Sequence, residues 1–232
     1  PAYKKLVNAI MRRLTREGEK LIAAQDAARL NTPDWLWDSW QQAYGKATGR
    51  KIAEAHLNEP PLDISIKSDP EIWAKALQAT VLPTGSLRMT IGGNVTALPG
   101  FDEGAWWVQD TAASLPALLL GDVKGKHVID LCAAPGGKTA QLLARGARVT
   151  AVERSAKRLE RLQQNMTRLN LSVEAVCADA NIWKPAEQAD AVLLDAPCSA
   201  TGTIRRHPDI SYLKKYSDVE SLSGAQHSLF EG

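Results

Sequence analysis

Short apolar runs alternate with amphipathic stretches along the second half of the chain. Four short runs, at 127–131, 148–152, 173–177 and 191–194, are mostly apolar, as expected for parallel strands that are buried on both faces. The clearest helix between them begins at Ser155, a favourable N-cap residue. Its apolar positions recur at helical spacing: Leu159, Leu162, Met166 and Leu169. This alternation predicts an α/β domain with a doubly wound parallel sheet and a ligand crevice at the carboxyl ends of the strands.

The chain before this domain has a different pattern. Residues 3–30 have apolar positions at helical spacing and many Lys and Arg residues, which predicts two basic helices. A further helix begins near Pro33, and we interpret its three tryptophans, Trp35, Trp37 and Trp40, as packing residues. Residues 62–66 alternate as a strand does, and 71–78 has helical spacing. We therefore expect a helical segment at 1–60, a small α+β module at 61–108 and the α/β domain at 109–232.

Composition excludes several protein classes. The 232 residues are 44% hydrophobic and 23% charged, which is incompatible with intrinsic disorder. The formal net charge of +2 does not by itself indicate a nucleic-acid partner. The three cysteines have no CxxC spacing and the four histidines are scattered, so neither a disulfide framework nor a metal site is expected. Since no apolar run approaches a membrane span and no signal peptide is evident, we expect a cytoplasmic protein without a membrane partner.

The loop after the first strand of the α/β domain carries the first candidate site. It runs from Asp130 to Thr139 and enters a helix through Gly136 and Gly137, so a nucleotide-like ligand can approach backbone N–H groups at a helix N-terminus. Gly137-Lys138-Thr139 also resembles the end of a phosphate-binding P-loop. That motif requires another glycine five residues before Gly137, where this chain has Cys132. The P-loop interpretation is therefore disfavoured.

Each of the next three strands ends in an acidic residue. Glu153, Asp179 and Asp195 follow the second, third and fourth strands, and parallel strands present their carboxyl ends at one edge of the sheet. Glu153 lies 17 residues after Gly136, close to the spacing at which an acid in such folds binds ribose hydroxyls. Three carboxylates at one edge need partners. The pattern predicts a ligand that is rich in hydrogen-bond donors.

A second motif follows the fourth strand, Asp195-Ala196-Pro197-Cys198-Ser199-Ala200-Thr201-Gly202. Together with DLCAAPGGKT at 130–139, it resembles the Fmu/Sun group of RNA cytosine-C5 methyltransferases, in the NOL/NOP/Sun superfamily. The resemblance implies a Rossmann-like, S-adenosylmethionine-dependent methyltransferase domain, preceded by the helical segment and the α+β module. It also implies that the domain is truncated here before its last strands, and that the helical segment is part of a longer RNA-binding region.

The resemblance also implies roles for individual residues. S-adenosylmethionine would be held at the first loop and at the strand ends, with Glu153 on the ribose and Asp179 beside the adenine. The implied cofactor-binding residues are Cys132, Ala133, Ala134, Pro135, Gly136, Gly137, Lys138, Glu153, Arg158, Asp179 and Asp195. Asp195 would lie between the cofactor and the target base, where a carboxyl group can stabilise an electron-rich cytosine adduct. The reaction forms that adduct by adding a thiolate to C6 of cytosine.

The role of Cys198 has two functional interpretations, and a third interpretation is a buried, inert thiol. DNA cytosine methyltransferases carry their nucleophile in a Pro-Cys pair after the fourth strand, which would make Cys198 the attacking thiol. In the RNA family the nucleophile lies in a Thr-Cys motif after a fifth strand, and the Pro-Cys thiol assists product release. This sequence contains no Thr-Cys pair, so the resemblance implies that the chain is catalytically incomplete. Cys177, inside a predicted strand, is expected to be a core residue.

The resemblance thus implies an RNA methyltransferase that forms 5-methylcytosine in ribosomal RNA, more specifically in 16S rRNA. We expect the protein to be a monomer. Four basic residues that follow the second motif are candidate RNA contacts beside the same crevice: Arg205, Arg206, Lys214 and Lys215. One alternative is a non-catalytic fragment that binds cofactor or RNA. Another is an amino-group methyltransferase, although such enzymes usually have a Pro-Pro-aromatic turn where this chain has Ala196-Pro197-Cys198.

Overall fold

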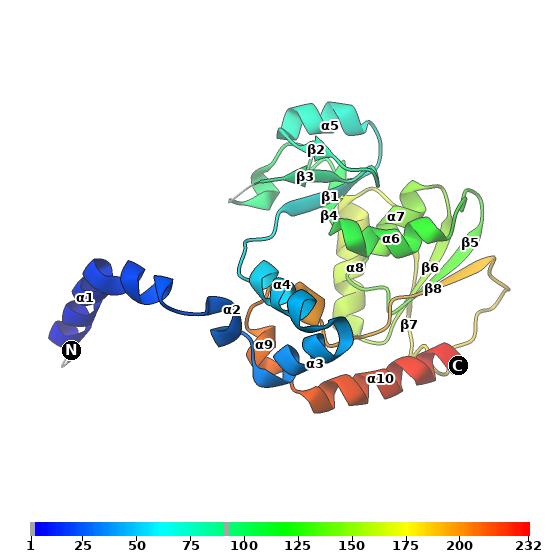
Figure 1. The fold of residues 1–232 in the computed structure, drawn as a ribbon. Coiled ribbons are helices and arrows are strands. Elements are labelled where there is room, and N and C mark those ends of the chain that lie inside the picture. The colour runs from blue at the N-terminus through cyan, green and yellow to red at the C-terminus, as the bar shows by residue number, and fades with distance from the viewer. Residues whose placement is uncertain (1–2, 91–92) are drawn as a thin grey trace. The chain divides into compact units, whose positions relative to one another are not determined.

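The computed structural model describes residues 3–90 and 93–232. The chain divides into two compact units. The first comprises Pro1–Pro60 with Ser199–Glu220, and the second comprises Pro61–Cys198 with Ser221–Gly232. Figure 1 shows the elements of both.

The first unit is helical. It contains α1 (Lys4–Ala23), α2 (Ala27–Leu30), α3 (Asp34–Tyr44) and α4 (Lys46–His56), followed by η2 (Thr201–Thr203), α9 (Ile210–Leu213) and the start of α10 (Tyr216–Glu231). The core of this unit includes Ala28, Leu36 and Ala53. α3 and α4 lie so close that a Cβ on Gly49 would be 3.1 Å from Cγ of Gln41. The tryptophans of α3 are half-buried beside this core.

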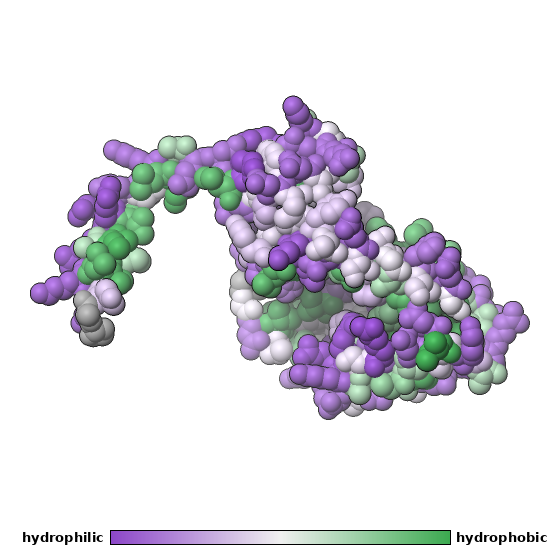
Figure 2. All heavy atoms as spheres, turned by 90° about the horizontal axis from the view of Figure 1, so that it is seen from below, coloured by the Kyte–Doolittle hydropathy of each residue, from purple (hydrophilic) through white to green (hydrophobic). Residues whose placement is uncertain are grey.

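The basic helix α1 forms as its spacing predicts. No residue of α1 is buried, and Figure 2 shows apolar and polar side chains next to each other along it. Its exposed apolar residues are Leu6, Val7, Ile10, Met11, Leu14, Leu21 and Ile22. The amphipathic pattern therefore produces a helix here without a buried face.

Residues 199–220 belong to the helical unit, which differs from the expected domain boundaries. The sequence pattern assigned them to the α/β domain at 109–232. In the structure Ile204 is buried, and the Arg205 guanidinium donates hydrogen bonds to the carbonyls of Asn58 (3.3 Å) and Glu59 (3.1 Å). These contacts join segments that are almost 150 residues apart, and local hydrophobic periodicity contains no information about such pairings.

The second unit begins with a small antiparallel sheet in the order β2-β3-β1-β4. Its elements are β1 (Leu62–Ile66), α5 (Pro70–Leu77), β2 (Thr80–Val81), β3 (Leu87–Met89), η1 (Val95–Ala97) and β4 (Trp106–Val108). Ile64, Leu87 and Trp106 form the centre of its core. The expected strand at 62–66 and the helix at 71–78 are confirmed within one residue.

The parallel sheet of the second unit has the order β7-β6-β5-β8. Its strands are β5 (His127–Leu131), β6 (Arg148–Glu153), β7 (Glu174–Cys177) and β8 (Ala191–Leu194), and its helices are α6 (Thr111–Leu119), α7 (Gly137–Ala144) and α8 (Ala156–Arg168). The chain proceeds outward from β5 to β6 and β7, then returns to place β8 on the other side of β5. This reversal is the topological switch point at which open α/β sheets bind ligands. The four predicted strands are confirmed, as is the Rossmann-like fold.

Helix α8 also follows its sequence pattern. The Ser155 hydroxyl caps it by accepting a hydrogen bond from the backbone N–H of Arg158. Leu159, Leu162 and Met166 are buried against the parallel sheet. The polar cap and the apolar stripe are both properties of neighbouring residues, which is why the sequence alone predicts them.

The expectation for Cys177 is wrong. Cys177 is exposed, and its Sγ lies 3.8 Å from the carbonyl oxygen of Arg154. It ends β7, which pairs with β6 on one side and forms an edge of the described sheet. An apolar run identifies a strand, but not whether the strand is central or at an edge.

The small sheet and the parallel sheet are joined within the second unit by contacts to the end of α8. Arg168 donates hydrogen bonds to the carbonyls of Phe101 (2.6 Å) and Trp106 (3.2 Å), and Lys67 donates to the carbonyl of Leu169 (2.8 Å). Gly104 approaches the same backbone closely. A Cβ at this position would lie 2.0 Å from the carbonyl oxygen of Arg168.

The described residues contain neither a helix that could cross a membrane nor a cluster of metal-binding side chains. None of the helices in 3–90 and 93–232 combines the length and the apolar character that crossing a bilayer requires. Within the same ranges, no three side chains of the His, Cys, Asp and Glu types gather closely enough to hold a metal ion.

Candidate active site

The parallel sheet brings the strand-end carboxylates to one edge, as predicted. Glu153 is the last residue of β6 and pairs with Cys177 at the end of β7. Asp195 directly follows β8, and its backbone N–H donates to the carbonyl of Leu131 on β5. Asp179 lies two residues after β7. Three separate segments therefore deliver acidic side chains to the carboxyl end of the sheet.

The loop after β5 enters α7 through a backbone conformation that requires glycine. Gly136 has a φ of +101°, a value that residues with a Cβ rarely adopt. A Cβ here would also lie 3.0 Å from Cε of Met166 and 3.1 Å from Cγ of Leu162. The loop thus packs directly on α8. Lys138, near the start of α7, places its ammonium group 2.7 Å from Oδ2 of Asp195.

A cavity of about 530 Å³ opens at this edge of the sheet. This size is within the range of small-molecule and cofactor sites. Its lining comes from the β5 loop, from the segments that follow β6, β7 and β8, and from α10: Cys132, Ala134, Arg154, Arg158, Asp179, Ala180, Asn181, Asp195, Ala196, Pro197, Cys198, Leu222, Ala225, Ser228 and Leu229. One side is polar and charged, and the α10 side is mostly apolar.

Helix α10 is attached to the cavity by two side-chain hydrogen bonds. Gln226 donates to the carbonyl of Pro197 (2.9 Å), and the Ser228 hydroxyl donates to Oδ1 of Asn181 (3.0 Å). The sequence pattern did not predict this wall. Leu222, Ala225 and Leu229 follow one another at three- and four-residue spacing, so a helical stripe was visible, but no local signal indicates which surface it covers.

Glu153 lies under the cavity and does not line it. Its side chain is 2% exposed, and Oε1 accepts a hydrogen bond from the backbone N–H of Ser155 (3.0 Å). Arg158 covers it, with Nη1 3.2 Å from Oε2 of Glu153 and Nη2 donating to the carbonyl of Ala134 (2.6 Å). Among the described residues no hydrogen bond reaches Oε2. Arg158, named in the sequence analysis, therefore stands between Glu153 and the cavity.

Asp130 supports the loop from within the sheet. It is fully buried, and its Oδ2 accepts a 2.6 Å hydrogen bond from the Thr139 hydroxyl. Burial raises the pKa of Asp130 to about 7, and the nearby Asp195 acts in the same direction, while Thr139 and Lys138 oppose it. Its Oδ1 has no hydrogen-bond partner in the described part of the chain.

Two thiols line the cavity. Cys132 is half-buried, and burial raises its pKa, with a further contribution from the Glu153 carboxylate. Its thiol is therefore a poor source of thiolate near neutral pH. Cys198 is exposed and lies in the same lining as Asp195. Both sequence-predicted catalytic residues thus open to one cavity.

The predicted RNA contacts belong to a different unit. Arg205, Arg206, Lys214 and Lys215 lie in the helical unit, whereas Asp195 and Cys198 lie in the α/β unit. Two N–H groups of Arg205 bond backbone carbonyls of its own unit. The expected position of these cations beside the crevice stays a prediction.

The residues around the cavity fit S-adenosylmethionine. Oε2 of Glu153 is buried and accepts no hydrogen bond from the described residues, and Nη1 of Arg158 lies 3.2 Å from it. A ligand hydroxyl can reach this oxygen when Arg158 moves away. Asp179 and Asn181 supply polar groups, and α10 supplies an apolar wall. Gly136 and Gly137 have no side chains, so a ligand can approach the backbone N–H groups at the N-terminus of α7. The strand-end carboxylates predicted a ligand rich in hydrogen-bond donors. The cavity region has the acceptor groups that such a ligand requires.

The chain is similar to known rRNA methyltransferases. The family model described as 16S rRNA methyltransferase RsmB/F matches residues 117–232. Ribosomal RNA small subunit methyltransferase B of Vibrio cholerae is 36% identical over 249 residues, covering 100% of this chain and 57% of the relative. The corresponding protein of Shewanella oneidensis is 38% identical over 241 residues, covering 98% and 56%. This chain therefore spans less than three fifths of the length of these curated relatives.

Solved structures show the same fold. The crystal structure of PH0851 has a TM-score of 0.80 and 25% identity, covering 86% of this chain and 49% of that one. NSun6 from Pyrococcus horikoshii with SFG has a TM-score of 0.72 and 19% identity, covering 85% and 78%. With its two loop motifs at the switch point of a parallel sheet, this chain belongs to the RsmB/F family of 16S rRNA methyltransferases, whose fold and cofactor are those of the S-adenosylmethionine-dependent methyltransferases.

Proposed function

We propose that this chain is the cofactor-binding and base-contacting part of an rRNA cytosine-C5 methyltransferase that forms 5-methylcytosine in 16S rRNA. The observation that carries the proposal is that Asp195, Cys198 and the Cys132 loop line one cavity at the switch point of the sheet. A carboxylate and a thiol beside a cofactor loop are the groups that covalent cytosine methylation requires.

S-adenosylmethionine supplies the methyl group in this proposal. We assign its methionine part to the loop from Cys132 to Lys138, its ribose to Glu153 and its adenine to the region of Asp179. Binding of the ribose at Glu153 requires the Arg158 side chain to move, because Arg158 now covers that carboxylate. Oε2 of Glu153 is buried and accepts no hydrogen bond from the described residues, so its acceptor capacity is left for a ribose hydroxyl once Arg158 has moved, which supports this assignment.

Asp195 is assigned to the target base. Lys138 holds one carboxylate oxygen at 2.7 Å, while about half of the Asp195 side-chain surface stays exposed. A fixed carboxyl group can hydrogen-bond the N3 and amino edge of cytosine and stabilise the electron-rich ring after a thiolate adds to C6. The target base must be unstacked to reach the cavity, which single-stranded or looped RNA permits at low energetic cost.

Cys198 is assigned to the release step rather than to the first attack. Release requires removal of the C5 proton and elimination of the thiol from C6. The attacking thiol is expected in a Thr-Cys pair, which this sequence does not contain. We therefore propose that this chain alone binds the cofactor but does not complete methyl transfer, and that the whole protein is a cytoplasmic monomer whose RNA contacts include Arg205, Arg206, Lys214 and Lys215.

The experiment uses RNA that contains 5-fluorocytidine, since fluorine blocks the final deprotonation and preserves whichever thiol adduct has formed. A protein extended to the length of its relatives should be trapped covalently, whereas this chain should not. In the extended protein Cys198→Ala should accumulate an adduct even with ordinary RNA, and Cys177→Ala should behave as wild type, because Cys177 is exposed but outside the cavity lining.

Other outcomes would change the assignment. Trapping by this chain that disappears in Cys198→Ala would make Cys198 the nucleophile. Mass spectrometry of digested product RNA separates the reaction classes, because methylation at an amino group yields a different nucleoside from 5-methylcytidine. An extended protein that binds S-adenosylmethionine and RNA but does not methylate the RNA would indicate a non-catalytic binding module.

A further inference from the structure

The helical unit contains a cavity of its own, of about 420 Å³, that the proposed methyl transfer does not use. It lies where the end of α4 meets the segment after η2. Its lining includes aromatic, cationic and hydrogen-bonding groups: Trp40, His56, Asn58, Arg205, Ser211 and Tyr212. All of these residues belong to the helical unit. An aromatic cavity with a few polar groups is the usual form of a small-ligand site.

The aromatic groups are arranged for contact with a planar ligand. The rings of Trp40 and His56 meet edge to face, with centroids 5.0 Å apart. Tyr212 lines the cavity while its residue surface stays 68% exposed. An exposed tyrosine next to a cavity leaves a large apolar face in water, where a nucleobase can stack on it.

The polar groups leave hydrogen-bonding capacity unused. Nδ1 of His56 is buried without a hydrogen-bond partner among the described residues, a condition that is rare in proteins and that a ligand would satisfy. Burial lowers the pKa of His56, and the Arg205 charge acts in the same direction. The imidazole is therefore neutral at pH 7 and can hydrogen-bond the edge of a base without carrying a charge.

Arg205 supplies a fixed cation at the cavity. Its Nε and Nη2 donate to the carbonyls of Asn58 and Glu59, which holds the guanidinium plane in place. The other N–H groups of this side chain have no partner in the described ranges, so they are available to an anion. Glu59 also lines the cavity, and its carboxylate disfavours a ligand with several negative charges, such as a free nucleoside triphosphate.

We propose that this cavity binds one unstacked nucleotide of single-stranded RNA, as a second RNA subsite that contains none of the residues lining the methyl-transfer cavity. The base stacks against Tyr212 and the Trp40–His56 pair, its polar edge meets Nδ1 of His56, and its single backbone phosphate meets Arg205. The proposal rests on RNA being the substrate, as proposed above. It assigns to Trp40 a ligand contact in addition to the packing role expected from the sequence.

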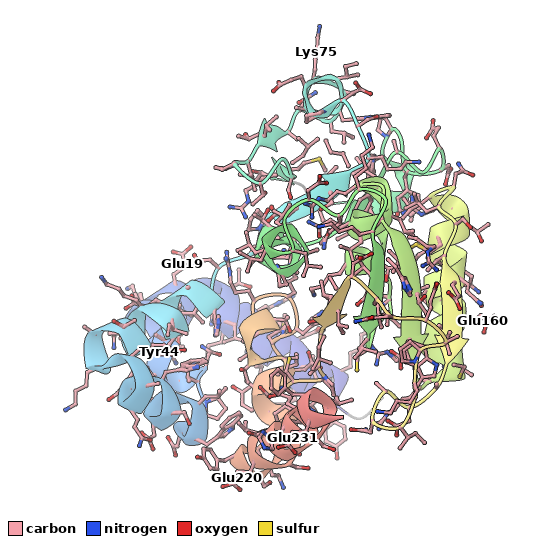
Figure 3. All side chains as sticks on the ribbon, turned by 90° about the vertical axis from the view of Figure 1, so that its right-hand side faces the viewer. Glu19, Tyr44, Lys75, Glu160, Glu220 and Glu231 are labelled. Carbon is pink, nitrogen blue, oxygen red and sulfur yellow. The ribbon has the colours of Figure 1, made fainter. Side chains whose placement is uncertain are left out.

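The first test measures binding to this chain directly. The probe is a fluorescently labelled RNA tetranucleotide, titrated at fixed low salt and followed by anisotropy. Tyr212→Ala should weaken binding by between about fivefold and a hundredfold, the range for loss of one base-stacking contact. The matched control is Tyr44→Ala, an equally exposed tyrosine (61%) of the same unit that is outside the cavity lining. Figure 3 labels Tyr44 at the end of α3; its variant should bind within twofold of wild type.

The second test locates the bound RNA without depending on a substitution. In a uniformly ¹⁵N-labelled chain, the indole signal of Trp40 and the imidazole signals of His56 should shift on titration with the tetranucleotide and saturate at the dissociation constant that anisotropy reports. Unmoved Trp40 and His56 signals at saturation, or equal affinities of the Tyr212→Ala and Tyr44→Ala variants, would overturn the proposal.

A third measurement separates failure of this proposal from failure of the proposed function. In the extended protein, Tyr212→Ala should raise KM for RNA and leave kcat for 5-methylcytidine formation unchanged. Tetranucleotide binding in the cavity without any 5-methylcytidine product would retain the subsite and refute the cytosine assignment. Normal 5-methylcytidine formation with wild-type KM in Tyr212→Ala would retain the function and refute the subsite.

Discussion

Nζ of Lys138 lies 2.7 Å from Oδ2 of Asp195, and this ion pair connects the start of α7 with the loop after β8. The two side chains differ in environment, since Lys138 is 14% exposed and Asp195 is 54% exposed. The lysine is therefore held within the fold, while the carboxylate stays accessible from the cavity. This ion pair fixes one carboxylate oxygen of Asp195 in the lining of the cavity.

Replacing this lysine should affect catalysis more than stability. In the extended protein, Lys138→Met should lower the rate of methyl transfer at least tenfold, a loss of about 1.4 kcal/mol in transition-state stabilisation, because Asp195 loses the group that orients it. The free energy of unfolding should fall by only about 1 kcal/mol or less, as for other partly exposed ion pairs. Lys157→Met, at an exposed position on α8, is the control. A variant with wild-type kcat would show that Asp195 does not need Lys138.

Glu153→Gln should weaken S-adenosylmethionine binding to this chain by about 1–2 kcal/mol, since a neutral amide replaces a charged acceptor for the ribose hydroxyls. The substitution keeps the shape of a side chain that is almost fully buried. Isothermal titration calorimetry measures the change. Glu160→Gln is the matched control, because Glu160 is exposed on α8, where Figure 3 labels it. Equal affinities of the two variants would remove Glu153 from the cofactor site.

Asp130 should make stability fall as pH rises toward neutrality. Burial raises its folded-state pKa from the ordinary 3.8 to about 7, so between these values the folded chain binds more protons at this carboxyl than the unfolded chain does. The free energy of unfolding therefore decreases with pH in this window, by at most about 1.4 kcal/mol per pH unit. The stabilising contribution is complete below pH 3.8 and is lost as pH rises through about 7.

Urea unfolding from pH 5 to pH 8 tests this prediction. Asp130→Asn does not titrate, and its amide oxygen can still accept the hydrogen bond from Thr139. The wild type should lose stability relative to this variant across the range. A difference in the free energy of unfolding that does not change with pH would contradict the raised pKa.

Gly104→Ala should destabilise the second unit strongly, by about 3 kcal/mol or more. Its φ of +64° disfavours any Cβ, and the added atom would lie 2.0 Å from the carbonyl oxygen of Arg168. Gly121→Ala is the control for backbone conformation alone, because Gly121 has a φ of +69° and nothing within 4 Å of its added Cβ. It should cost about 1–2 kcal/mol. Similar chemical denaturation midpoints for the two variants would show that the backbone at Gly104 and at Arg168 moves apart at little energetic cost.

The features of this protein that depend on neighbouring residues are predictable from the amino-acid sequence. The four parallel strands follow from short, mostly apolar runs, and α8 follows from the Ser155 cap and its apolar stripe. The three acidic strand ends meet because parallel topology leaves them no other edge. These features needed no knowledge of distant contacts, and together with the two loop motifs they were sufficient to predict the fold and the family.

Which distant segments pack together became known from the three-dimensional structure. It showed Arg158 over Glu153, placed α10 as a wall of the cavity, and assigned residues 199–220 to the helical unit through Arg205 and the end of α4. It also showed Cys177 at an exposed sheet edge. These four features have one cause. Each depends on contacts between segments that are distant in the sequence and that folding brings together. The periodicity of apolar residues along the chain does not say which distant segments make contact.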